Sequence, residues 1–348
     1  MTLPLANARF LIGRAIVCLV CVSLCRAQTN TDFDKGTTEF QAGNYVVAAA
    51  LFARAESASP GTTAALLYQA KCLAQMQDFN GAEGALRRYI SSHPDSSDAL
   101  YMLGFVLNRQ NRPSDSLRAY TQAAALTPPA GDDLKIVALD YVLLDDYADA
   151  TNWLEKAVGR DPKNEDAWYY LGRAYYTKAR LGEARKAFET VLTLNPRSSK
   201  AENNLGLILE TEGQTATAMK AYQTAIAWQE HSSRPSEQPY VNLGNLLMEQ
   251  GKTKEAIPPL EKAVALAPNN AFCRMTLGMA YRQLGQLDAA QRELEKATQL
   301  EPDNAKAHYQ LGRLYKDIHD TVRARAEFDK TAELKTRSAG SNPARPKH

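Results

Sequence analysis

The sequence predicts an all-α solenoid of stacked helix pairs, and three features that share one period predict it. Prolines recur every 34 residues from Pro60 to Pro196, and the spacing resumes at Pro268 and Pro302 after a slip of four residues. Within each unit, positions 8 and 20 are small and position 24 is large, while position 15 is often a turn residue. A single helix pair cannot bury its own apolar face, so such units must stack. Nine units are expected, beginning at residues 29, 63, 97, 131, 165, 199, 237, 271 and 305.

Each unit divides into a first helix, a tight turn and a second, antiparallel helix. Positions 4, 7, 8 and 11 share one side of the first helix, and positions 20, 24 and 27 share one side of the second. Residues such as Gly43 and Asn111 at position 15 tolerate the left-handed backbone that ends a helix. Small residues at positions 8 and 20 let the two helices approach closely, and the proline at position 32 ends the second helix.

This pattern resembles the tetratricopeptide repeat family over residues 29–338. The resemblance implies a right-handed superhelix of nine antiparallel helix pairs, whose first helices line a concave groove where partners bind. These markers are specific for the fold and say little about the ligand. The match is closest in the fifth unit, where the family's marker positions hold Trp168, Leu171, Gly172, Tyr175, Ala184, Phe188 and Pro196.

Three segments fall outside the regular repeats. Residues 1–27 carry Arg9 and Arg14 before an apolar run, which predicts a secretory signal peptide cleaved after Ala27; an uncleaved anchor is the alternative. The protein is therefore expected outside the cytoplasm, either periplasmic or secreted, with no membrane span in the mature chain. Residues 231–238 are interpreted as an exposed extension, with a functional loop or a hinge as alternatives. Residues 339–348 are expected to be disordered.

Composition argues against several classes of function. Without residues 1–27 the chain has 38 Lys and Arg against 39 Asp and Glu, a net charge of −1, so no electrostatic case for nucleic acid remains. Leu246 stands where a phosphate-binding loop ending in Gly251-Lys252-Thr253 needs a glycine. The histidines show no metal-ligand spacing, and no nucleophile motif is present. The sequence predicts no enzyme, cofactor or metal.

Polar and aromatic residues on the side of the first helices opposite the core are the candidate binding residues. In the fifth unit, Tyr169, Arg173 and Tyr176 lie opposite Leu171 and Tyr175. Packing between neighbouring units is the alternative explanation for any one of these side chains. Aromatic platforms bind apolar side chains, amides bond an extended backbone, and arginine pairs with carboxylates. The predicted peptide-binding residues are Tyr101, Phe105, Tyr169, Arg173, Tyr176, Asn203, Asn204, Asn242, Asn245, Arg282, Tyr309 and Arg313.

These features predict a non-enzymatic scaffold that binds a peptide or an extended protein segment, as an adaptor in an envelope, assembly or secretion complex. Two alternatives stay open. One is an accessory subunit that presents substrate to a partner enzyme, such as a glycosyltransferase. The other is a structural protein that self-associates through the exposed ends of its repeats.

Overall fold

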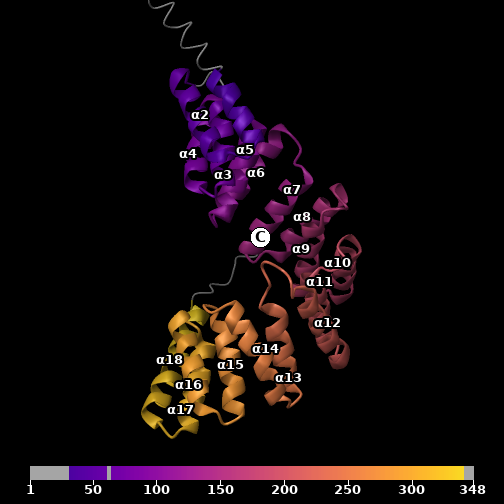
Figure 1. Ribbon diagram of the computed structural model, residues 1–348, viewed down its shortest axis with the longest axis vertical. Coiled ribbons are helices and arrows are strands. Elements are labelled where there is room, and N and C mark those ends of the chain that lie inside the picture. Colours follow the sequence, from indigo (N-terminus) through magenta and orange to yellow (C-terminus); the bar gives the residue numbers. More distant parts are fainter. Residues whose placement is uncertain (1–30, 61–63, 341–348) are drawn as a thin grey trace, which may run out of the picture. The chain divides into compact units, whose positions relative to one another are not determined.

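The structure is a computed structural model that describes residues 31–60 and 64–340, so the expected signal peptide and most of the expected disordered tail lie outside it. Within these residues every regular element is a helix, and helical residues 31–41 precede the first labelled helix. Figure 1 shows the labelled helices as a succession along the chain. The chain divides into two compact units, residues 1–178 and 179–348, which are described separately. The prediction of an all-α repeat solenoid is confirmed by this architecture.

Unit 1 is a stack of antiparallel helices joined by tight turns. Each helix packs on the next one along the chain, and α5 also contacts α7, which contacts α9. The first helices α5, α7 and α9 therefore form one layer. The helices are α2 (Tyr45–Ala58), α3 (Ala65–Gln75), α4 (Phe79–Ser92), α5 (Ser97–Arg109), α6 (Pro113–Leu126), α7 (Gly131–Leu143), α8 (Tyr147–Arg160) and α9 (Glu165–Thr177).

Unit 2 repeats this arrangement. Contacts from α11 to α13, from α13 to α15 and from α15 to α17 define its layer of first helices. The helices are α10 (Leu181–Leu194), α11 (Ser199–Thr211), α12 (Thr215–Trp228), α13 (Gln238–Glu249), α14 (Thr253–Leu266), α15 (Ala271–Gln283), α16 (Leu287–Leu300), α17 (Ala305–Asp317) and α18 (Thr321–Gly340).

The periodic prolines determine where the second helices end. For example, α4 ends at Ser92, two residues before Pro94, and α16 ends at Leu300, two residues before Pro302. The residue before a proline is restricted to extended conformations, so it cannot continue the helix. Two further prolines, Pro258 and Pro259, lie inside α14 and remove two backbone donors from that helix.

Every turn at position 15 has a left-handed backbone, including turns that the sequence does not mark. Gly213 has φ of 75° and Asn111 has φ of 59°, as their residue types suggest. Gln77, Ala179 and His319 occupy the same conformation with φ of 62°, 56° and 62°. This conformation is strained for residues with a Cβ atom. At Gln77 and His319, packing between the two flanking helices therefore overrides this local preference.

The extension between α12 and α13 is closed by a buried amide. Gln229 is 5% exposed, its Nε2 donates to the Ser236 carbonyl at 2.7 Å, and its Oε1 accepts from the Ser236 amide at 2.9 Å. Residues 231–234 are exposed, whereas residues 235–237 are half-buried. The loop is thus tied at its base and exposed at its tip.

No helix in residues 31–60 and 64–340 is both long enough and apolar enough to cross a membrane.

Candidate functional site

A hollow of about 420 Å³ lies between the first helices α5 and α7 of unit 1. Tyr101, Met102 and Phe105 line it from α5, and Ile136 adds an aliphatic wall from α7. The remaining lining residues are Asp132, Asp133 and Lys135 in the first turns of α7. This volume is within the range of ligand pockets, and an apolar floor with a few polar groups at one end is typical of them. Two of the predicted binding residues, Tyr101 and Phe105, are thus brought to one open site.

The Tyr101 side chain is held in place by its own repeat. Its hydroxyl donates to the Thr127 carbonyl at 2.5 Å, and its ring lies 5.8 Å from the Tyr120 ring. Burial and the nearby Asp133 carboxylate raise the pKa of Tyr101, while Arg160 opposes this shift. The ring is therefore a fixed wall of the hollow, with its hydroxyl already committed.

Carboxylates surround the α7 end of the hollow. Lys135 Nζ lies 3.0 Å from Asp132 and 3.9 Å from Asp166 of α9. Asp133 Oδ2 accepts from the Ala130 amide at 3.0 Å, which caps α7. Burial, followed by the charges of Asp132 and Asp98, raises the pKa of Asp133. Burial is the main cause of this shift, and the two neighbouring carboxylates add a smaller contribution.

On α9, the residues predicted as core and those predicted to bind a partner differ in burial. Leu171 and Tyr175 are buried, and the Tyr175 hydroxyl donates to Glu155 Oε1 at 2.7 Å. Arg173 is exposed, whereas Tyr169 and Tyr176 are half-buried. The Tyr169 ring lies edge-on to the Tyr170 ring, 5.5 Å away. Tyr169 and Tyr176 are therefore partly accessible, Arg173 is the exposed member of the cluster, and the binding role of all three stays a prediction.

The predicted amide group of unit 2 is largely engaged within the protein. Asn242 Nδ2 on α13 donates to Asn203 Oδ1 on α11 at 2.9 Å, and Asn203 is only 6% exposed. Asn204 Nδ2 donates to the Lys200 carbonyl at 2.7 Å, and Asn245 is half-buried on α13. Instead of a row of open amides, the structure has a hydrogen bond that joins two neighbouring repeats.

At the far end of unit 2, the predicted cations differ in availability. Arg282 Nη1 pairs with Asp317 Oδ2 at 2.8 Å, and its side chain is 11% exposed, so it links α15 to α17. Arg313 is exposed. Tyr309 is 42% exposed, and its ring lies 5.9 Å from the Phe328 ring. Arg313 and Tyr309 therefore remain on the surface, while Arg282 serves packing between repeats.

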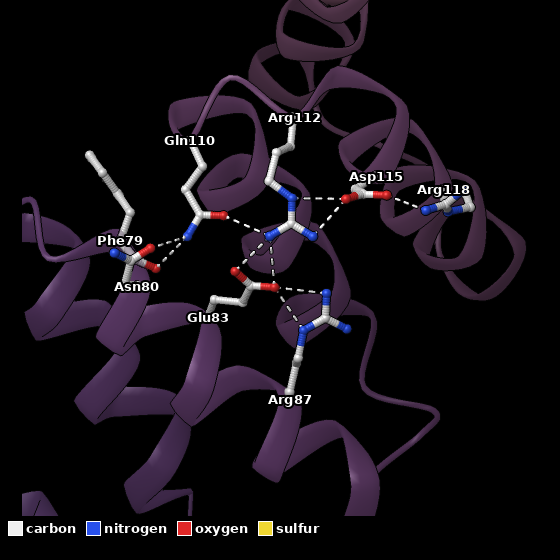
Figure 2. A network of polar contacts seen from close by, with 8 residues as sticks. All are labelled: Phe79, Asn80, Glu83, Arg87, Gln110, Arg112, Asp115 and Arg118. Atoms are coloured by element: carbon white, nitrogen blue, oxygen red, sulfur yellow. Dashed lines mark hydrogen bonds and ion pairs between the residues drawn. The ribbon is translucent and has the colours of Figure 1, made fainter.

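A polar network that the sequence does not indicate joins the second and third repeats at their turns (Figure 2). Arg112 Nη1 donates to Glu83 Oε2 at 2.9 Å, and Arg112 Nε donates to Asp115 Oδ2 at 2.8 Å. Arg87 shares the Glu83 carboxylate, and Gln110 reaches the Phe79 carbonyl at 3.1 Å. Burial favours a higher pKa for Glu83, but hydrogen bonds from Arg87, Gln110 and Arg112 outweigh it and lower the pKa. The charges of this network pair with one another, so the network stabilises the contact between the two repeats.

A second unforeseen feature is a buried acid on α7. Asp140 is fully buried, and its Oδ1 accepts from Asn108 Nδ2 of α5 at 2.8 Å. Burial raises the pKa of Asp140 to about 6, although Ser116 and Asn108 oppose the shift. Asp140 occupies position 10 of its repeat, to which the repeat pattern assigns no role. Its burial could therefore not be predicted from the sequence without knowledge of the Asn108 contact.

No cluster of three His, Cys, Asp or Glu side chains suited to a metal ion occurs among residues 31–60 and 64–340. Cys72 and Cys273 are both buried free thiols.

Family models cover most of the repeats. Models described as tetratricopeptide repeat match residues 39–104 and 142–203, residues 173–235 and residues 237–270. A further model, described as TPR repeat, matches residues 278–318.

Curated relatives are much longer than this chain. BBSome complex member BBS4 of Bos taurus is 22% identical over 60% of this chain, which spans 33% of that relative. Cellulose synthase operon protein C of Pseudomonas fluorescens is 28% identical over 44% of this chain and 12% of its own length. Protein CTR9 homolog of Arabidopsis thaliana is 27% identical over 72% of this chain and 21% of its own length. The chain thus spans a third or less of these three relatives.

Solved structures share the fold. A tetratricopeptide repeat protein from Parabacteroides merdae has a TM-score of 0.60 at 19% identity, covering 72% of this chain and 96% of that one. The APC/C hetero-tetramer Cut9–Hcn1 gives 0.59 at 16% identity, covering 78% of this chain and 52% of that one. At such identities the likeness concerns the fold alone. From its repeat period, its helix pairs and these matches, the chain belongs to the tetratricopeptide repeat family.

Proposed function

We propose that this protein is an exported, non-enzymatic adaptor that binds an extended segment of a partner protein along its first helices. The observation that carries the proposal is the hollow between α5 and α7, where Tyr101, Phe105 and Ile136 present apolar surface beside charged groups. A scaffold of packed helices holds these side chains at fixed positions, which lowers the entropy cost of binding a flexible segment. The exposed Arg173 on α9 extends the same layer of first helices.

The relatives support a role in assemblies. One of them is named as a member of the BBSome complex, and another as a protein of a cellulose synthase operon. Because this chain spans only part of each relative, the shared repeats point to protein binding in general and leave the partner open.

Site-directed photo-cross-linking tests the binding face. A photo-reactive phenylalanine derivative replaces Phe105 in the hollow in one preparation and Leu126 in another. Leu126 is the matched control, because it is 48% exposed at the end of the second helix α6. A protein partner cross-linked at residue 105 and absent at residue 126 supports the proposal. Equal capture at both sites, or capture at residue 126 alone, contradicts it.

Export is proposed from residues 1–27, where two arginines precede an apolar run and small residues Cys25 and Ala27 precede the expected cut. Mass spectrometry of protein purified from the full-length gene checks this. An N-terminus at Gln28 in the extracytoplasmic fraction supports export, whereas intact Met1 in the cytoplasmic fraction contradicts it.

A further inference from the structure

Position 2 of the repeats is acidic in three repeats of unit 1 and basic in two repeats of unit 2, where Gln238 and Phe272 occupy it in the other two. In unit 1, Asp98, Asp132 and Asp166 occupy it, in the first turns of α5, α7 and α9. In unit 2, Lys200 and Lys306 occupy it, in the first turns of α11 and α17. The helix dipole favours acids at a helix N-terminus and disfavours lysine. The dipole therefore accounts for part of the preference for acids in unit 1, but the lysines of unit 2 show that a repeat does not require an acid there.

Capping does not explain these acids. The Ser96 side chain accepts from the Ala99 amide and caps α5, and the Asn164 side chain accepts from the Ala167 amide and caps α9. For α7, Asp133 makes the reciprocal bond to the Ala130 amide. The side chains of Asp132 and Asp166 remain 73% and 58% exposed. A row of carboxylates is thus presented to solvent along the first helices of unit 1.

The charges around the hollow do not balance locally. Lys135, with its side chain 18% exposed, lies between Asp132 and Asp166, so two carboxylates share one ammonium group. Asp133 adds a third carboxylate at the wall, and Asp98 is close enough to act on it. Arg160 is a further cation, close enough to lower the pKa of Tyr101. The carboxylates around α7 therefore exceed the nearby cations, and an added cation gains favourable interactions there.

The floor of the hollow beside these carboxylates is apolar. Phe105 and Met102 are half-buried hydrophobic residues that pack on the core formed by α3 to α6, so one surface of each is fixed and another faces the hollow. Ile136 closes the opposite wall. An aromatic or aliphatic side chain would bury its surface here, within reach of the carboxylates of α7.

We propose that the hollow between α5 and α7 binds a segment of a partner protein in which a bulky apolar side chain is flanked by lysine or arginine. The apolar side chain enters between Phe105 and Ile136. The flanking cations lie along Asp98, Asp132 and Asp166. The inference rests on the proposed function, because it names the chemistry of the segment that the adaptor binds.

Selection from a random peptide library displayed on phage tests this without assuming a sequence. The purified protein is the bait, and peptides are recovered by elution at high salt and then by acid. The expected result is enrichment of peptides with Lys or Arg next to an aromatic or aliphatic residue. Fluorescence anisotropy of the most enriched peptide then gives Kd. Replacing its cations with glutamate should weaken binding at least about tenfold, since several exposed ion pairs are lost.

Isosteric variants locate the site on the protein. The triple variant Asp98→Asn, Asp132→Asn and Asp166→Asn should weaken binding of the selected peptide by about tenfold and reduce its dependence on salt. Asp288→Asn is the matched control, since Asp288 is an exposed carboxylate in the first turn of the second helix α16, and it should leave Kd unchanged. Ile136→Ala should weaken binding of the same peptide with little effect on its salt dependence. Circular dichroism verifies that each variant is folded.

The outcomes separate this inference from the proposed function. Enriched peptides that are neutral or acidic, yet lose binding in the Ile136→Ala variant, overturn the charge preference and leave groove binding standing. Cationic peptides that bind the triple variant as tightly as the unchanged protein also overturn the inference. If no peptide is enriched and residue 105 cross-links no partner, both proposals fall.

Discussion

The Tyr222 ring lies against the backbone of Gly206, so close that a Cβ atom added to Gly206 would stand 2.5 Å from the ring. Tyr222 is fully buried, and its hydroxyl donates to Glu210 Oε2 at 2.5 Å. Gly104 and Tyr120 repeat this arrangement in unit 1, with 2.6 Å between the added Cβ and the ring. Position 8 therefore sets how closely the two helices of a repeat approach.

Gly206→Ala should destabilise unit 2 by about 1–3 kcal/mol, because the fully buried Tyr222 ring would have to shift to admit the new methyl group. This loss should occur although alanine favours helices more than glycine does. Combining Gly206→Ala with Tyr222→Leu should cost less than the sum of the two single changes, since the smaller side chain relieves the contact. Chemical denaturation of the four proteins measures the coupling, and additive effects would contradict it.

His319→Gly should raise the stability of unit 2 by about 1 kcal/mol. His319 has φ of 62° at an exposed turn, and glycine adopts this conformation without strain. The converse change, Gly285→Ala at a turn with φ of 74°, should lower stability by a similar amount. Thermal melting of both variants checks the pair, and a destabilised His319→Gly protein would show that the imidazole makes a contact of its own.

Asp140→Asn should stabilise unit 1 near neutral pH. The pKa of Asp140 is raised to about 6, so folding favours its protonated form. Below about pH 4 the protonated Asp140 carboxyl has little effect on the free energy of unfolding. Above pH 6 its charged form lowers that free energy by about 1–3 kcal/mol. The variant should therefore melt at a higher temperature than the unchanged protein at pH 7 and at a similar one at pH 4. Equal melting differences at both pH values would refute this assignment.

Gln229→Ala should release the loop between α12 and α13. It removes two hydrogen bonds to the Ser236 backbone, leaving that backbone unpaired at a cost of about 1–3 kcal/mol. Limited proteolysis should then cut within residues 231–236 faster than in the unchanged protein. His231→Ala, at an exposed position in the same loop, is the control and should not alter the rate.

The sequence predicts the fold well because the repeat signal concerns backbone geometry and close packing. Gly206, for example, stands at position 8, where small residues recur in every repeat. They recur because the same close contact between helices recurs in other repeats. Gln77 and His319 are not residue types that favour turns. They are identified as turn residues because they occupy position 15 of a pattern that occurs nine times. Fold information is therefore redundant along the chain.

The site is less predictable, because it depends on pairings between repeats that have no period. Tyr101 and Phe105 could be placed on one helix face from the sequence. That Asn203 would be covered by Asn242, or Arg282 neutralised by Asp317, depends on residues 39 and 35 positions away that belong to different repeats. Asp98, Asp132 and Asp166 lie 34 residues apart in the sequence, but the exposure of their side chains is known only from the structure.

The contacts within each unit join a helix to its next neighbour or to the next but one. Under a stretching force applied to the ends of such a unit, no single set of bonds bears the whole load. Helix pairs would separate one after another, each lengthening the molecule at a low force. Within unit 2, α14 lacks the backbone donors of Pro258 and Pro259, which makes its repeat the one to yield early. A solenoid built in this way is compliant: it can extend and recoil while its other repeats remain folded.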